Sequence, residues 1–93
     1  MRYKENGSYV KGWKKIGGSW YYFGSDAKMV RGWRQIGGKW YYFTSSGAMK
    51  TGWLQYGSKW YYLDSSGAML ANTSRTIGGK TYYFDSTGAC TNP

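Results

Sequence analysis

Six tryptophans are the residues of this chain best suited to chemistry, and they recur in pairs. In each pair one Trp follows a Gly, and the other opens a Trp-Tyr-Tyr string. Indole faces carry negative electrostatic potential, so paired indoles can hold a cation by contacts worth ~0.5–2 kcal/mol each. Quaternary ammonium groups are typical ligands of such aromatic sites. The pairs are Trp13 with Trp20, Trp33 with Trp40, and Trp53 with Trp60.

The remaining composition argues against catalysis and against metal or cofactor sites. The 93 residues include no His, one Cys and four acidic residues, which excludes nucleophile–His pairs, intramolecular disulfides and Cys/His zinc sites. No two carboxylates are placed to converge as in a glycosidase. Asp64 and Asp85 occupy equivalent positions after a repeat, where Asp commonly caps a turn. Cys90 falls where other repeats have Met, and we interpret it as a small apolar substitute.

The charge balance favours an anionic partner. Thirteen basic residues minus four acidic ones give +9, a balance that attracts teichoic acid, membranes or nucleic acid. The cations are scattered over all repeats without a nucleic-acid-binding motif, so we expect no nucleic-acid partner. No apolar run reaches the ~18 residues of a membrane span, so we expect no membrane insertion. No signal peptide is visible, so we expect a fragment or a mature segment.

A twenty-residue repeat organises the sequence. Gly-Trp recurs at 12–13, 32–33 and 52–53, and the Trp-Tyr-Tyr strings keep the same interval. In the last unit Asn72-Thr73 replaces Gly-Trp, one residue is inserted, and Thr81 replaces the second Trp. The whole chain is therefore expected to be a single repeat module cut from a longer array. Its expected parts are the tail of a truncated repeat at 1–11, full repeats at 12–31, 32–51 and 52–71, and a degenerate terminal repeat at 72–93.

Each repeat has the pattern of a β-hairpin, with aromatic strands flanking a two-residue turn such as Gly17-Gly18. This turn sets the register and places Trp13 opposite Tyr22. Because side chains alternate between faces, Trp13, Trp20 and Tyr22 share one face, while Ile16, Tyr21 and Phe23 share the other. A lone hairpin is marginally stable in water, so neighbours must stack. We predict an all-β solenoid of stacked hairpins.

Two interpretations of the tryptophan face remain open. The indoles could pack between hairpins as part of the core, or they could form binding sites. The absence of Leu and Ile from this face favours sites. The last hairpin has Thr73 and Thr81 in place of both Trp but keeps Tyr83. This fits a cage of two Trp from one hairpin and a Tyr from the next.

The strings GWKKIGGSWYYF, GWRQIGGKWYYFTSSGAMKTGW and GWLQYGSKWYYLDSSGAM resemble the choline-binding repeats of Gram-positive surface proteins and phage lysins. The resemblance implies a left-handed solenoid in a secreted, wall-attached protein. It also implies that the module is not an enzyme and binds phosphocholine on wall teichoic and lipoteichoic acids. Carried over by position, the implied sites are Trp13, Trp20 and Tyr42; Trp33, Trp40 and Tyr62; and Trp53, Trp60 and Tyr83, with Met29, Met49 and Met69 as additional walls.

A sister family with similar repeats binds α-glucans, and the last unit, TIGGKTYYFDSTGA, resembles that type more closely. Carbohydrate binding is therefore the alternative function. A purely structural role is a third alternative, because exposed terminal hairpins favour end-to-end self-association and Cys90 could cross-link in an oxidising medium.

Overall fold

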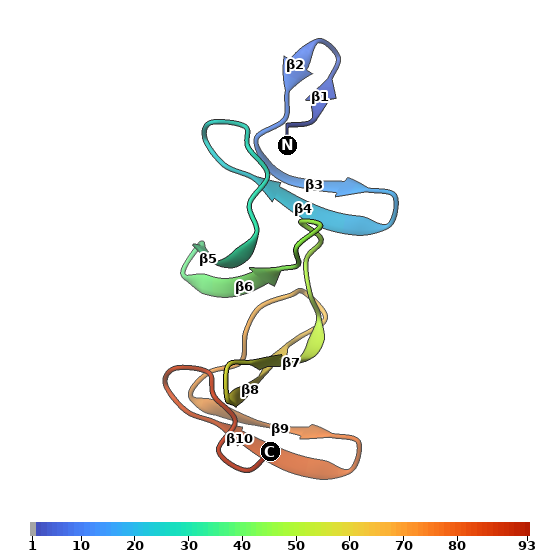
Figure 1. The fold of residues 1–93 in the computed structure, drawn as a ribbon. Coiled ribbons are helices and arrows are strands. Elements are labelled where there is room, and N and C mark those ends of the chain that lie inside the picture. The colour runs from blue at the N-terminus through green and yellow to red at the C-terminus, as the bar shows by residue number, and fades with distance from the viewer. Residues whose placement is uncertain (1) are drawn as a thin grey trace. The chain divides into compact units, whose positions relative to one another are not determined.

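The computed structural model describes residues 2–93, and these residues form successive antiparallel β-hairpins with no helix (Figure 1). The all-β prediction is confirmed. Contacts divide the chain into a unit that ends at Lys50 and a second unit, Thr51–Pro93. The first unit contains β1 (Lys4–Glu5), β2 (Ser8–Tyr9), β3 (Gly12–Ile16), β4 (Ser19–Phe23), β5 (Gly32–Ile36) and β6 (Lys39–Phe43). The second contains β7 (Gly52–Tyr56), β8 (Lys59–Leu63), β9 (Thr73–Ile77) and β10 (Lys80–Phe84).

The predicted register is confirmed in the first three complete hairpins. Trp13 lies opposite Tyr22, and Trp33 and Trp53 have equivalent partners. Gly17 and Gly18 both have positive φ, at 58° and 86°, as a type I′ turn requires. Glycine takes this conformation without steric cost. The two-residue turn therefore fixes which side chains share a face.

The fourth hairpin corrects one detail of the alignment. Thr73 lies opposite Phe84, as Gly12 lies opposite Phe23, while Ser74 lies opposite Tyr83. Ser74, and not Thr73, therefore occupies the position of the first tryptophan. The inserted residue therefore precedes the strand, as counting back from the Gly78-Gly79 turn also indicates. Thr81 does occupy the position of the second tryptophan, and its hydroxyl lies 3.0 Å from that of Thr76 across the hairpin.

A short loop after each hairpin folds back along the second strand. In the first repeat, Met29 forms an antiparallel bridge with Phe23, and the amide of Val30 donates to the carbonyl of Tyr22. The same pattern follows β6, β8 and β10. Asp64 caps its loop as predicted, because its Oδ1 accepts hydrogen bonds from the amide and hydroxyl of Ser66 and from the amide of Ala68. Asp85 caps the last loop with the equivalent partners.

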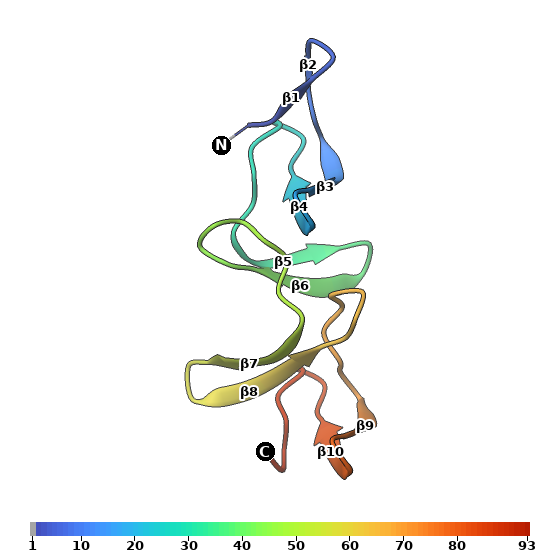
Figure 2. The same ribbon diagram turned by 90° about the vertical axis from the view of Figure 1, so that its right-hand side faces the viewer.

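The core of each repeat centres on the last residue of its second strand. Phe23, Phe43 and Leu63 are completely buried, and Phe84 is nearly so. Within each unit, consecutive hairpins are turned relative to one another, as β3–β4 and β5–β6 show in both views (Figure 2). The face of one hairpin is thereby brought against the next.

The N-terminal segment differs from the loops to which it aligns. Residues 2–11 contain a small hairpin of β1 and β2 around Asn6-Gly7, whereas the other loops have a single bridge. Lys14 donates to Glu5 across 2.6 Å, linking this hairpin to β3. Residue 1 of the predicted truncated repeat lies outside the described residues.

Gly47 provides a test of how the loop of one repeat packs on the preceding repeat. Its φ is +89°, and a Cβ there would overlap Sδ of Met29. We expect Gly47→Ala to lower the free energy of unfolding by about 1–3 kcal/mol, from backbone strain and displacement of Met29. Chemical denaturation measures this. The cost should shrink when Met29→Ala removes the overlap, and an equal cost in both backgrounds would contradict the packing argument.

The loop aspartates predict weakening in acid. For Asp64, burial raises the pKa, but hydrogen bonds from Ser66 and Ala68 and the charge of Arg75 outweigh it and hold the pKa below its ordinary value. The hydroxyl of Thr87 is the main cause of the lowered pKa of Asp85. A lowered folded-state pKa stabilises above the unfolded-state pKa, and this stability is lost as pH falls through the folded-state value.

We therefore expect the melting temperature to fall as pH drops below about 4. Asp64→Asn should reduce this dependence, because Asn keeps the oxygen acceptor without titrating, and adding Asp85→Asn should reduce it further. Thermal unfolding between neutral pH and pH 2 measures the effect. An unchanged acid dependence in the double variant would show that these loops do not titrate with folding.

Candidate functional site: aromatic cages

The second unit contains an aromatic pocket of about 400 Å³ lined by Trp53, Trp60, Tyr82 and Pro93. The indoles of Trp53 and Trp60 meet nearly edge to face, with ring centroids 6.2 Å apart at 86°. The ring of Tyr82 lies 4.8 Å from that of Trp53. Tyr82 belongs to the following hairpin, so the cage is assembled from two consecutive hairpins, as predicted.

The first unit repeats this arrangement. The rings of Trp13 and Trp20 lie 6.3 Å apart at 82°, and the ring of Tyr41 lies 5.0 Å from that of Trp13. Trp13 and Trp20 are still 36% and 41% exposed, although their rings have aromatic neighbours. They are therefore partly packed and partly open to a ligand.

The structure places a different tyrosine in each cage from the one that the sequence predicted. Tyr41 and Tyr82 contact the indoles, whereas the prediction named Tyr42 and Tyr83. Tyr42 instead contacts Trp33 of its own hairpin at 5.2 Å, and Tyr83 is 55% exposed.

The reason lies in how consecutive hairpins meet. The tryptophan face of one hairpin packs on the opposite face of the next, since Trp13 also contacts Phe43. Tyr41 shares that face with Phe43, two residues away, while Tyr42 points to the other side. Strand alternation thus selects the first tyrosine of the Tyr-Tyr pair in the following hairpin, Tyr41 in the first unit and Tyr82 in the second.

The second predicted site draws on both units. Trp33 and Trp40 belong to the first unit, and Tyr62 belongs to the second. The side chain of Trp40 is 41% exposed, and Tyr62 contacts Trp53 of its own hairpin, with ring centroids 5.1 Å apart. This second site stays a prediction.

The predicted methionine walls differ in their surroundings. Met29 and Met69 lie against the loop glycines Gly47 and Gly88, and Met69 is not among the residues lining the cage of its unit. Met49 approaches the first cage through its backbone, because its amide donates to the carbonyl of Trp20 across 2.8 Å.

Cys90 takes the equivalent place in the second unit. Its amide donates to the carbonyl of Trp60 across 2.8 Å, and its side chain is 8% exposed. Cys90 forms a buried cluster with Leu70 and Phe84, against which Trp53 and other aromatic residues pack. Its environment fits the interpretation of Cys90 as an apolar substitute for Met.

Sequence reasoning missed the C-terminal wall of the second cage. Asn92 accepts a hydrogen bond from the amide of Tyr83 and donates one to the carbonyl of Thr81, so its side chain pairs with the edge of β10. Pro93 follows and lines the pocket. Asn92 carries no repeat signal, since the corresponding residue of the preceding repeat is Ala71.

The cages are aromatic rather than anionic. None of the residues that line the Trp53 pocket is acidic. Across residues 2–93 no cluster of three or more His, Cys, Asp or Glu could hold a metal ion, and no helix in this part of the chain is long and apolar enough to cross a membrane. A cation bound here would be held by ring faces alone, as in aromatic cages for quaternary ammonium groups.

Comparison with known proteins identifies this combination of fold and site. The sequence matches the choline-binding repeat family over residues 10–35 and 30–74, and the putative cell wall binding repeat family over residues 75–90. No curated protein matches the chain. The hairpins and aromatic cages thus define a cell-wall-binding repeat module, and the chain belongs to the choline-binding repeat family.

Solved structures give the same assignment. Choline binding protein F from Streptococcus pneumoniae, crystallised in the presence of a peptidoglycan analogue, is 43% identical with a TM-score of 0.89 over 96% of this chain and 30% of that chain. The choline binding domain of Spr1274 from the same species is 42% identical with a TM-score of 0.77, over 89% of this chain and 96% of that one. The modular autolysin LytC, also from this species, is 34% identical with a TM-score of 0.76, over 96% of this chain and 21% of that chain. The chain therefore spans less than a third of choline binding protein F.

The burial of Cys90 predicts slow thiol chemistry. Reaction with a thiol reagent needs an accessible thiolate, and the side chain is 8% exposed. We expect native protein to react at least about tenfold more slowly than protein unfolded in denaturant, as followed by absorbance of the released thiolate. Equal rates would contradict the buried position.

Proposed function

We propose that this chain binds choline in its aromatic cages. The observation that supports it most directly is the pocket of Trp53, Trp60 and Tyr82, where two nearly perpendicular indoles and a phenol present ring faces without a carboxylate. A trimethylammonium group suits such a site because it is attracted by ring quadrupoles and has no hydrogen to donate. In the first unit, Trp13, Trp20 and Tyr41 repeat the arrangement.

The proposed role is attachment to choline-bearing polymers of the bacterial wall, namely phosphocholine on teichoic and lipoteichoic acids. The net charge of +9 supports this, since it favours association with polyphosphates. Several weak sites on one polymer add by avidity, so a millimolar affinity at each cage, ~4 kcal/mol, is sufficient. The module acts in a secreted protein and performs no catalysis itself.

A tyrosine pair within one strand gives the sharpest test of the cages. We expect Tyr82→Ala to remove about one choline site from the measured stoichiometry, because it deletes a wall of the second cage. Tyr83→Ala should leave stoichiometry and affinity unchanged, because that side chain is 55% exposed and lies outside the cage. Equilibrium dialysis or calorimetry with choline gives the count.

Folding of both variants is checked by thermal unfolding without ligand. Loss of the site in Tyr83→Ala but not in Tyr82→Ala would restore the original prediction and contradict the cage described here. Stabilisation by an α-glucan and not by choline would favour the carbohydrate alternative, since only a ligand of the folded state raises the melting temperature. No response to either would mean that the indoles serve only packing.

A further inference from the structure

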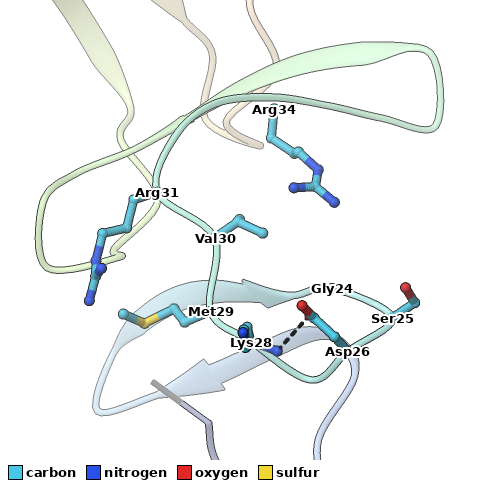
Figure 3. A pocket seen from close by; sticks show the side chains of 8 residues that line it. All are labelled: Gly24, Ser25, Asp26, Lys28, Met29, Val30, Arg31 and Arg34. Carbon is cyan, nitrogen blue, oxygen red and sulfur yellow. Dashed lines mark hydrogen bonds between the residues drawn. The ribbon is translucent and has the colours of Figure 1, made fainter.

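A second pocket in the first unit has a different chemistry from the cages. It has a volume of about 310 Å³ and lies between the loop after β4 and the start of β5 (Figure 3). Three cationic side chains and one carboxylate contribute to its lining, so the lining charge is +2. The lining residues are Gly24, Ser25, Asp26, Lys28, Met29, Val30, Arg31 and Arg34.

Of the three cations, only Lys28 is specific to this repeat, because Lys14 and Arg75 take the position of Arg34 in other hairpins and Lys11 lies twenty residues before Arg31. Lys28, Arg31 and Arg34 correspond, twenty residues later, to Ala48, Thr51 and Leu54. The neighbouring repeat forms the same hairpin and the same loop with these uncharged residues. The fold therefore does not require the cations.

Arg34 is placed where an anion could reach it. It lies opposite Tyr41 across the hairpin, so the two side chains share a face. In Figure 3 it extends from β5 toward the loop, and its Nη2 lies 3.8 Å from the point that a Cβ on Gly24 would occupy. Among residues 2–93, the salt bridge of this unit joins Lys14 to Glu5, and no carboxylate oxygen lies within 4 Å of a nitrogen of the Arg34 guanidinium.

The second unit shows what this arrangement looks like with an acidic neighbour. Arg75 lies opposite Tyr82, as Arg34 lies opposite Tyr41. Its charge helps to lower the pKa of Asp64, which corresponds by position to Gly24. In the first repeat, glycine replaces this aspartate, and the carboxylate of Asp26 lies nearby instead, with its Oδ1 3.2 Å from the point that a Cβ on Gly24 would occupy. Asp26 forms no salt bridge with Arg34.

Asp26 is the negative group of the pocket. Its Oδ1 accepts a hydrogen bond of 3.0 Å from the backbone amide of Lys28, so the carboxylate is engaged with its own loop. Arg31 extends on the other side of Val30 in Figure 3, so it contributes charge more than contact. Arg34 is thus the side chain best placed to contact an anion.

We propose that this pocket, with Arg34 as its main contact, binds a phosphate group. A guanidinium presents a planar fork of donors that pairs with two phosphate oxygens, and Lys28 and Arg31 add positive charge. The phosphate could be a phosphodiester of a choline-bearing polymer or free inorganic phosphate. Binding of phosphate does not depend on the proposed function. Only the identification of its source as a choline-bearing polymer does, because the pocket lies beside Tyr41 of the first cage.

The neighbouring repeat supplies the matched variant: Lys28→Ala, Arg31→Thr and Arg34→Leu together give this loop the residues of the next one. Titration with inorganic phosphate at low salt, followed by amide NMR shifts, should move residues 24–34 in the native protein. The triple variant should bind roughly tenfold more weakly. Arg75→Leu, which removes one equivalent charge elsewhere, should leave these shifts unchanged.

A second titration, with choline and with glycerophosphocholine, distinguishes a polymer phosphodiester from free phosphate as the natural ligand. If the phosphate belongs to a choline-bearing polymer, the native protein should bind glycerophosphocholine more tightly than choline. The triple variant should lose this difference while its affinity for choline stays unchanged. No preference, with intact binding of inorganic phosphate, assigns the pocket to free phosphate. Absence of phosphate shifts, or equal shifts in both proteins, overturns the proposal. Failure of choline to bind would instead refute the cages, because the phosphate arm uses no choline.

Discussion

Each of the two units depends on the contact between the tryptophan face of one hairpin and the opposite face of the next. A hairpin of this length cannot bury both of its faces, and two strands alone are marginal in water. Trp13 shows the solution, because its ring contacts Tyr22 of its own hairpin and both Tyr41 and Phe43 of the next. One side chain therefore stabilises the stack and forms a wall of the cage.

This double role explains why the packing and binding interpretations of the indoles do not exclude each other. Trp13 is packed on three rings and is still 36% exposed. The completely buried residues are Phe23, Phe43 and Leu63 at the strand ends, so the closed core lies beside the cages and not within them. The exposed indole surface remains available to a ligand.

Local chemistry made much of this structure predictable. Two positive-φ turn residues dictate the hairpin register, so the partnership of Trp13 and Tyr22 followed from Gly17-Gly18. The capping role of Asp64 followed from its short side chain beside a loop. The choice between Tyr82 and Tyr83 did not follow, because it depends on which faces of two neighbouring hairpins pack together. The repeat length and the alternation of side chains within one strand do not determine this. The position of the inserted residue before β9 could be predicted, because Ser74 lies four residues before the Gly78-Gly79 turn, as Trp13 lies four residues before Gly17-Gly18. Strand pairing confirms that Ser74 takes the tryptophan position.

The repeats share one backbone but differ in the side chains around it. The last hairpin has Ser74 and Thr81 in place of two indoles, and the first loop has cations where the next has uncharged residues.

The central claim is that two indoles of one hairpin and the first tyrosine of the Tyr-Tyr pair in the next hairpin enclose a trimethylammonium group. A crystal structure with bound choline tests it most directly. The account predicts ligand density between Trp53, Trp60 and Tyr82, whereas choline seated against Tyr83, or that pocket closed by repacked rings in saturating choline, would contradict it.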